Sequence, residues 1–355
     1  IPTTRALCVV DSDTNVYREQ RESGAMLIRV TPSHIRFGHF EFCSFGDLHD
    51  ELKTLCDFVI DQHYPEFKSS KQPYADFFTA TLEKTAKLMA HWQRIGFCHG
   101  VMTTDNMSIL GDTFDFGPFA FLDDYDPEFI CNHSDDQGRY RFAQQPNIAN
   151  WNLAVLAQAL LPLVEKDILI PILDSFPKIF KLHYVQMMGD KLGFIDQSST
   201  KPTQHSLTKN QLDGREDIVN ETVKMLTSCR LDYSHFFRKL ANIHEPEIYS
   251  LIRNMALDVT AFDQWFTLYK TAIEDNGQAF SDSDRTSLMN NVNPKYILRN
   301  YLAQNAIEAA QAGDYSQVEQ LNKVLQSPYS EQPELDHLSK LPPDWGKKLE
   351  ISCSS

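Results

Sequence analysis

One acidic segment constrains the fold of this 355-residue chain more than any other feature. The residues between Ile95 and Gly138 include nine carboxylates and no lysine or arginine. Such a segment repels itself unless a cation is bound or basic residues from elsewhere in the chain converge on it. A charge run alone is more often a solvated loop, so the order of residue types within it decides between the two interpretations.

Three short patterns follow one another in this segment: His99-Gly100, Asp105-Asn106 and Asp115-Phe116-Gly117. A carboxylate beside an amide, followed by a second carboxylate, supplies the oxygen ligands that Mg²⁺ prefers. Protein kinases use a catalytic-loop Asp and Asn and then the Asp of an Asp-Phe-Gly motif in the same order. This chain differs from kinases, because they place four residues between the Asp and the Asn, whereas Asp105 and Asn106 are adjacent.

Two arginines precede the acidic segment, at the end of an apolar run. Arg29 and Arg36 lie seven residues apart and bracket a Pro-Ser-His turn. Guanidinium groups make planar, two-point contacts with phosphate oxygens, so the pair could converge on one anion. Alternatively, each arginine pairs with one of the many carboxylates, and the spacing alone favours neither interpretation.

Composition excludes several classes of function. A formal net charge of −15 is too acidic for a general nucleic-acid or anionic-membrane binder. The longest uncharged stretch, 142–164, is interrupted by Asn, Gln and Pro and suits a buried helix better than a membrane span. The seven cysteines are scattered without metal-ligand spacing, which indicates a reducing compartment, the cytoplasm, and no zinc site.

The order of apolar patterns predicts an α+β fold in which helices dominate. Short apolar runs at 5–10 and 25–30 indicate two strands of a hairpin. Helical spacing then covers 47–63, 74–95 with a stop at Gly96, and 148–164, and it continues with loops to about Ala312. We interpret 198–204 as a linker, 327–343 as a mostly irregular tail, and the run Trp151, Leu153, Leu156, Leu160 and Leu161 as core.

Long stretches of the chain closely resemble the SelO (YdiU) family. The resemblance covers the whole chain and is carried by RVTPSHIRFGHFE at 29–41, HGVMTTDNMSILG at 99–111, FDFGPFAFLDDYDP at 114–127 and VNPKYILRNYLAQNAIEAA at 292–310. The chain looks like a bacterial member whose N-terminal portion is missing. The adjacent Asp-Asn pair is the family's own pattern.

The resemblance implies a protein-kinase-like fold with an incomplete N-terminal lobe. Residues 1–72 would be the remainder of that lobe and the following helix. Residues 73–200 would form the mostly helical C-terminal lobe with the catalytic and metal-binding loops, and 201–355 a helical C-terminal extension with a redox-type tail.

It also implies a metal-dependent enzyme of the pseudokinase type that transfers AMP from ATP to Ser, Thr or Tyr hydroxyls of proteins. UMP transfer from UTP is attributed to bacterial members as well. Carried over by motif, Asp105 is the proton acceptor, Asn106 and Asp115 hold Mg²⁺ or Mn²⁺, and Arg29 and Arg36 contact the nucleotide phosphates together with Asp115. The alternative is a catalytically inactive kinase-like module that binds nucleotide or a partner protein, but a scaffold alone needs no metal ligands.

Cys353 lies two residues from the end of the chain, at a position that the family fills with Cys or selenocysteine. Exposure there favours redox chemistry, and Cys131, just after the acidic residues, is the preferred disulfide partner. A passive exposed thiol is the alternative. We expect His99 to be a structural hydrogen-bonding residue, and Asn132 to belong either to the site or to a turn held by side-chain bonds.

We expect the chain Ile1–Ser355 to be inactive by itself. A kinase-like N-terminal lobe places a glycine-rich loop and a lysine over the phosphates, and none of the 14 glycines here forms a Gly-x-Gly. Transfer of α-labelled AMP by this chain, beside a form extended at its N-terminus, measures the difference. Equal rates would show that the expected N-terminal elements are dispensable.

Overall fold

A computed structural model describes residues 1–17, 21–194, 209–275 and 281–351. Helices dominate these residues, and two small antiparallel sheets accompany them, which confirms the expected mostly helical α+β composition. No helix within the described ranges is both long and apolar enough to cross a membrane.

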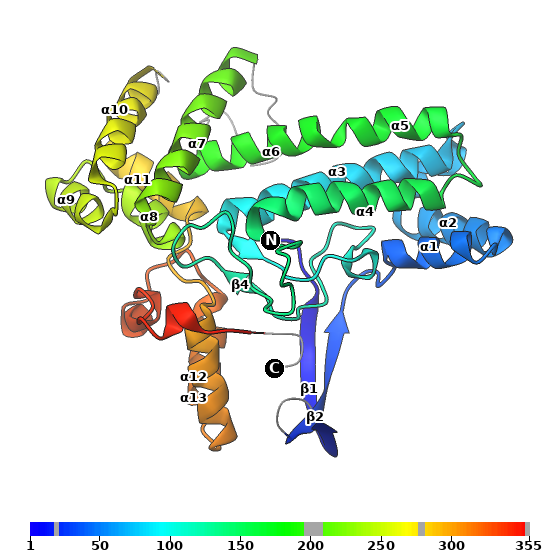
Figure 1. Cartoon of the computed structure of the whole chain (residues 1–355), viewed down its shortest axis with the longest axis horizontal. Coiled ribbons are helices and arrows are strands. Elements are labelled where there is room, and N and C mark those ends of the chain that lie inside the picture. The colour runs from blue at the N-terminus through cyan, green and yellow to red at the C-terminus, as the bar shows by residue number, and fades with distance from the viewer. Residues whose placement is uncertain (18–20, 195–208, 276–280, 352–355) are drawn as a thin grey trace.

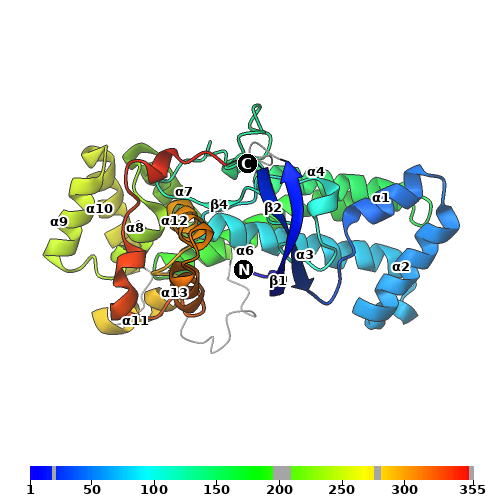
Figure 2. The same ribbon diagram turned by 90° about the horizontal axis from the view of Figure 1, so that it is seen from below.

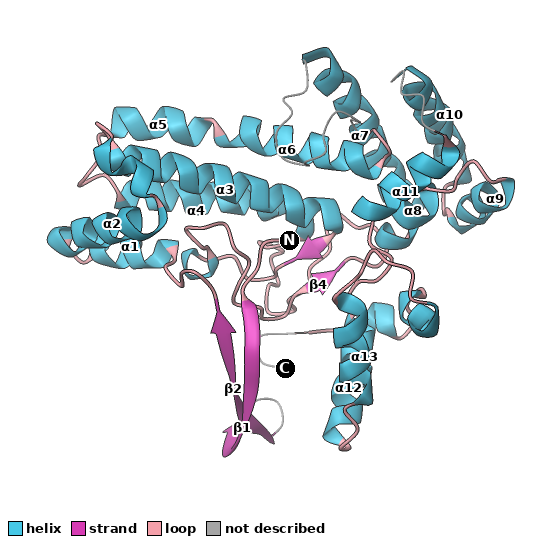
Figure 3. Cartoon of the chain, turned by 180° about the vertical axis from the view of Figure 1, so that it is seen from behind, coloured by secondary structure: helices cyan, strands magenta, loops and turns pink. Residues whose placement is uncertain are grey.

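The first sheet is a long hairpin of β1 (Arg5–Tyr17) and β2 (Arg21–Val30). Arg5 lies opposite Val30 and Tyr17 opposite Arg21, with two register shifts between. The ribbon projects away from the helical body (Figures 1 and 3). The expected hairpin is confirmed, but both strands are longer than the apolar runs, because cross-strand pairing continues through the polar residues on either side of the turn.

Six helices form the layer that carries the site: α1 (Phe37–Phe45), α2 (His49–His63), α3 (Pro73–Ile95), α4 (Gln145–Ala159), α5 (Lys166–Asp174) and α6 (Phe176–Lys191). The long helix α3 packs against α6 and α4, and Figure 2 shows them running along the same axis. Buried Phe77, Phe78 and Trp92 fill the core beneath α3. Gly96 ends α3 in the left-handed conformation, with φ 72°, as the sequence predicts.

One expectation about the core is wrong in part. Leu153, Leu156 and Leu160 are buried, but Trp151 is 51% and Leu161 44% exposed. The helical period of 3.6 residues turns Trp151 to the opposite face of α4 from Leu153. There its ring lies 4.9 Å from the guanidinium carbon of Arg139, a cation–π contact on the surface.

The remaining helices build the C-terminal extension. They are α7 (Lys209–Cys229), α8 (Tyr233–Leu240), α9 (Pro246–Met255), α10 (Val259–Asp275), α11 (Asp282–Val292), α12 (Asn300–Gln311) and α13 (Ser316–Leu325). The expected linker at 198–204 lies outside the described residues. The tail 327–343 is irregular as expected except for the 3₁₀ helix η4 (Pro333–Ser339).

The acidic segment lies between these bodies, around the short sheet of β3 (Phe97–Cys98) and β4 (Ala120–Phe121). Arg299, just before α12, is 3% exposed and donates to Asp123 and to Asp232, its Nη1 lying 2.7 Å from Asp232 Oδ2. Asp232 also caps α8, where its Oδ1 accepts from the backbone N–H of His235. One buried guanidinium therefore joins the acidic segment to two helices of the extension.

Arg299→Ala should destabilise the protein by about 3–5 kcal/mol, because it leaves the buried Asp232 carboxylate without its cation. Arg253→Ala is the matched control: Arg253 also makes a two-point contact with an aspartate, Asp263, but both side chains are more than a third exposed. Its loss should be much smaller, because water screens an exposed ion pair. Urea unfolding measures both values, and equal losses would contradict a dominant role for the buried pair.

Candidate functional site

Both sequence-predicted arginines converge on one carboxylate. Arg29 Nη1 lies 2.6 Å from Asp115 Oδ1, and Arg36 Nη1 lies 2.8 Å from Asp115 Oδ2. All three side chains are 21–27% exposed, so their charges face solvent on one side. Of the two interpretations of the sequence, convergence on one anion and pairing with carboxylates, the structure combines both, since the shared anion is Asp115.

The backbone holds Asp115 in an uncommon conformation. Its φ is 57°, in the left-handed region that Asp and Asn tolerate better than other non-glycine residues. His99 supports the preceding residue: its Nε2 lies 2.8 Å from the Phe114 carbonyl oxygen, and its ring stacks on Trp92. Burial lowers the pKa of His99, so the neutral ring donates from Nε2. The expected structural role of His99 agrees with this geometry.

Asp105 and Asn106 lie in a 3₁₀ turn, Thr104–Asn106, seated against the start of α1. Arg36 Nη1 donates to the Asp105 carbonyl oxygen at 2.9 Å, and Thr104 Oγ1 donates to Glu41 of α1 at 2.6 Å. Asn106 Oδ1 accepts from the Thr103 hydroxyl. Arg36 therefore contacts the backbone carbonyl of Asp105 and the side-chain carboxylate of Asp115, and so it links the two loops that carry these residues.

Helix α1, against which the Asp105-Asn106 turn packs, was not predicted from the sequence. A β-carbon on Gly38 would lie 2.1 Å from Asp105 Oδ1, so the carboxylate occupies the space that a side chain would fill. The backbone N–H of Phe37 donates to the Met107 carbonyl. The sequence does contain a pattern that predicts this helix, because Phe37 and Phe40 are three residues apart and so share a helical face. The structure buries both side chains fully.

Basic residues pair with four further carboxylates of the acidic segment, which lowers its self-repulsion. Besides the two arginines on Asp115, ion pairs join Arg299 to Asp123, Lys347 to Asp124, Arg230 to Asp126 and Arg141 to Glu128. Three of these cations come from the C-terminal extension. Nothing in the local sequence identified them, because they lie more than 100 residues further along the chain.

Cys131 is buried, and its thiol lies 3.4 Å from the Cys98 carbonyl oxygen. The contact with Cys98 and then burial raise the pKa of Cys131 far above its usual range. Asn132 holds a turn through side-chain bonds, since its Oδ1 accepts from the backbone N–H of Ser134. Cys353 lies outside the described residues, but the backbone N–H of His133 donates to the carbonyl of Ile351, which places Ile351 beside His133, two residues after Cys131 in the sequence. The Cys353–Cys131 pairing stays a prediction.

The donor set fits a hard divalent ion in chemistry, since Asp115 and Asn106 offer carboxylate and amide oxygens. Within the described ranges, no three or more His, Cys, Asp or Glu side chains gather as a metal site. An ion held by Asp115 and Asn106 would need further ligands, such as nucleotide phosphates and water. Paired guanidiniums beside such oxygens, on an α+β scaffold, define a nucleotide-dependent transferase class of site.

The chain belongs to the family described as protein adenylyltransferase SelO, whose sequence model matches residues 1–326. It is 47% identical over 355 residues to the protein nucleotidyltransferase YdiU of Pseudomonas aeruginosa. The YdiU proteins of Stutzerimonas stutzeri and Vibrio cholerae are each 48% identical to it, over 356 and 359 residues. All three alignments cover 100% of this chain and 70% of the relative.

Gly38→Ala should leave the fold intact and displace the Asp105 carboxylate, because the clashing atom is the end of a flexible side chain and alanine favours a helix. We expect α-labelled AMP transfer, assayed in the N-terminally extended form, to fall by about 10²-fold or more with nucleotide affinity nearly unchanged. Gly214→Ala is the control, since no atom outside its own helix lies within 4 Å of the added β-carbon.

The double variant Gly38→Ala/Asp105→Ala separates a positioning role from a general structural one. If Gly38 acts only through Asp105, the double variant should lose no more transfer than Asp105→Ala alone. Additive losses would contradict this role.

Proposed function

We propose that this chain is a metal-dependent protein adenylyltransferase that transfers AMP from ATP to Ser, Thr or Tyr hydroxyls of protein substrates. Membership of the SelO family supports the reaction class. The observation that carries the site assignment is the convergence of Arg29 and Arg36 on Asp115. UMP transfer from UTP is a second donor choice, and the family resemblance supports it.

The proposed chemistry divides among these side chains. The hydroxyl oxygen of the substrate attacks the α-phosphorus of ATP, the bond from that phosphorus to the bridging oxygen breaks, and pyrophosphate leaves. Asp105 orients the hydroxyl and accepts its proton, and the two arginines hold phosphate oxygens. Mg²⁺ or Mn²⁺ held by Asp115 and Asn106 would neutralise the charge of the phosphates.

The present ion pairs make the site ready to exchange anions. Asp115 occupies the guanidinium groups of Arg29 and Arg36, so their side chains are already held in one place before nucleotide binds. A nucleotide's phosphates offer more acceptor oxygens and more negative charge than one carboxylate, so they can compete with Asp115 for both guanidinium groups. Nucleotide would take over the arginines and release Asp115 toward its proposed role as a metal ligand.

The fold assignment is part of the proposal. We assign residues 1–72 to a kinase-like N-terminal lobe, 73–200 to the C-terminal lobe and 201–355 to the extension. The hairpin of β1 and β2, followed by helices that carry the Asp-Asn turn and Asp115, supports that order. The alternative, an inactive nucleotide-binding module, is separated by labelling: ATP labelled on the α-phosphate modifies protein only in a transferase of AMP, whereas γ-label transfer indicates a kinase.

Asp115→Asn should abolish the metal dependence of ATP binding while leaving metal-free binding equal or tighter, because both arginines lose a competing carboxylate. Asn tolerates the positive φ at this position, so the fold should be retained. Asp105→Ala should keep metal-supported binding and lower turnover by about 10²- to 10⁴-fold. Calorimetry with and without Mg²⁺, beside α-labelled transfer in the extended form, measures both. Equal loss of metal-supported binding in the two variants would contradict the division of roles.

A further inference from the structure

The C-terminal extension contains a cavity of about 320 Å³ that is lined largely by charged side chains. It lies between α8, the end of α11, the loop before α12 and the 3₁₀ helix η4. Its charged lining comprises Arg238, Lys239, Lys295 and Lys340, with the carboxylates Glu331 and Asp336. Four cations against two anions leave a local excess of positive charge in a chain whose net charge is −15. Arg299 also lines the cavity, but Asp123 and Asp232 offset its charge.

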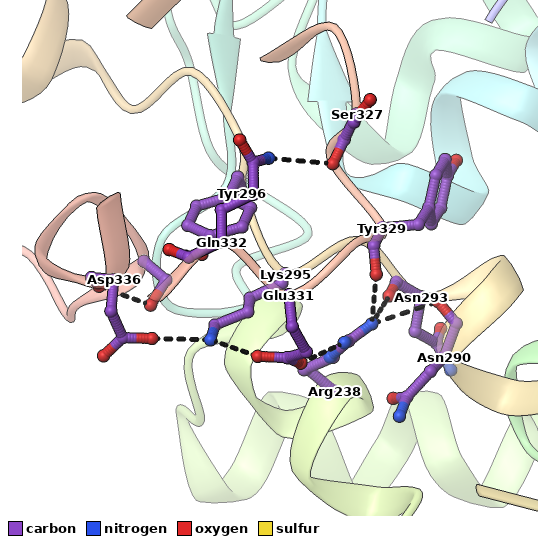
Figure 4. Close-up of polar contacts among 11 residues, drawn as sticks. Arg238, Asn290, Asn293, Lys295, Tyr296, Ser327, Tyr329, Glu331, Gln332 and Asp336 are labelled. Carbon is purple, nitrogen blue, oxygen red and sulfur yellow. Dashed lines mark hydrogen bonds and ion pairs between the residues drawn. The ribbon is translucent and has the colours of Figure 1, made fainter. Parts of the chain in front are cut away.

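Arg238 and Glu331 form the rigid frame of this cavity. Arg238 is 11% exposed, and its Nη1 donates at 3.0 Å to the carbonyl oxygens of both Asn290 and Asn293. Its Nη2 contacts Glu331 Oε1 at 2.6 Å, and Lys295 contacts the other oxygen of Glu331 at the same distance (Figure 4). Arg238 and Glu331 are therefore hydrogen-bonded on both sides, and Glu331 in turn fixes the position of Lys295.

Three lysines and one exposed carboxylate belong to the charged lining of the same cavity, namely Lys239, Lys295, Lys340 and Asp336. Lys295 Nζ contacts Asp336 Oδ1 at 2.5 Å, as Figure 4 shows. Lys239 and Lys340 form no ion pair within the described part of the chain, yet both lie close enough to Asp336 to help lower its pKa, after the larger effect of Lys295. The Asp336 side chain is 56% exposed and sits on the short helix η4. An oxyanion is thus held where two lysines still have free donors.

We propose that this cavity binds a compact phosphate-bearing small molecule, and that the Asp336 carboxylate occupies the position of one of its phosphate groups. Lysine ammonium groups bind phosphate as point charges with several donors each. The volume lies at the lower end of small-molecule pockets, which span roughly 300–1,000 Å³. The site shares no residue with Arg29, Arg36, Asp105, Asn106 and Asp115, so it is a second anion site and does not depend on the proposed transfer reaction.

Inorganic pyrophosphate, without divalent ions, is the probe. Acetylation of individual lysines, followed by mass spectrometry, reports occupancy of this cavity without interference from the arginine site. Pyrophosphate should protect Lys239 and Lys340 with one common midpoint and leave Lys68 unprotected, since Lys68 lies far along the chain, in the 3₁₀ helix η1 (Pro65–Ser69) between α2 and α3. Asp336→Asn should lower that midpoint by about two- to fivefold, because it removes the competing carboxylate while Glu331 still holds the frame.

Two outcomes would overturn the proposal. One is an absence of protection at Lys239 and Lys340, or an unchanged midpoint in Asp336→Asn. The other is protection by a short polyglutamate peptide but not by pyrophosphate, which would assign the cavity to an acidic protein segment. Lys239→Gln/Lys340→Gln provides the binding control: calorimetry should show one pyrophosphate site fewer, with the thermal unfolding midpoint nearly unchanged, since neither lysine is ion-paired among the described residues.

Discussion

Neutralisation of the acidic segment by distant basic side chains is the interaction on which the rest of the structure depends. Apart from Arg141, the cations that pair with the segment come from distant parts of the chain, so these ion pairs are also tertiary contacts. The buried pair of Arg299 with Asp123 and Asp232 is the strongest case, because neither Arg299 nor Asp232 has water to solvate its charge. This buried pair therefore joins the acidic segment to the C-terminal extension.

The same balance prepares the site for phosphate. Asp115 holds Arg29 and Arg36 at fixed positions without a ligand, and its left-handed backbone turns the carboxylate toward both. Side chains held in place beforehand lose less entropy when nucleotide binds. Asp336 is likewise paired with Lys295, in a cavity that Lys239 and Lys340 also line. In both places an aspartate of the chain is paired with basic side chains, and in both proposals a phosphate group of the ligand replaces that carboxylate.

The position of the Asp105-Asn106 turn depends on contacts with the first residues of α1 as well as on the acidic segment itself. Gly38 admits the Asp105 carboxylate, and Glu41 of the same helix accepts from Thr104. Asp105 and Asn106 were named from the sequence, but α1, which begins inside the family motif that spans 29–41, was not predicted. The apolar spacing of Phe37 and Phe40 was legible, whereas the close approach of Gly38 required coordinates.

The sequence by itself determined the mostly helical α+β class, the hairpin, the ends of α3 and the residue types of the site, because these follow from local periodicity, turn chemistry and motif order. It also indicated that the acidic segment repels itself unless cations converge on it, and it left a solvated loop as the alternative. Only the tertiary structure decided which cations arrive. Arg299, Arg230 and Lys347 are more than 100 residues along the chain from their partners, and nothing in local pattern encodes such a pairing. The cavity around Lys295 belongs to the same category, because its lining joins residues from 238 to 340 that meet only when the helices pack.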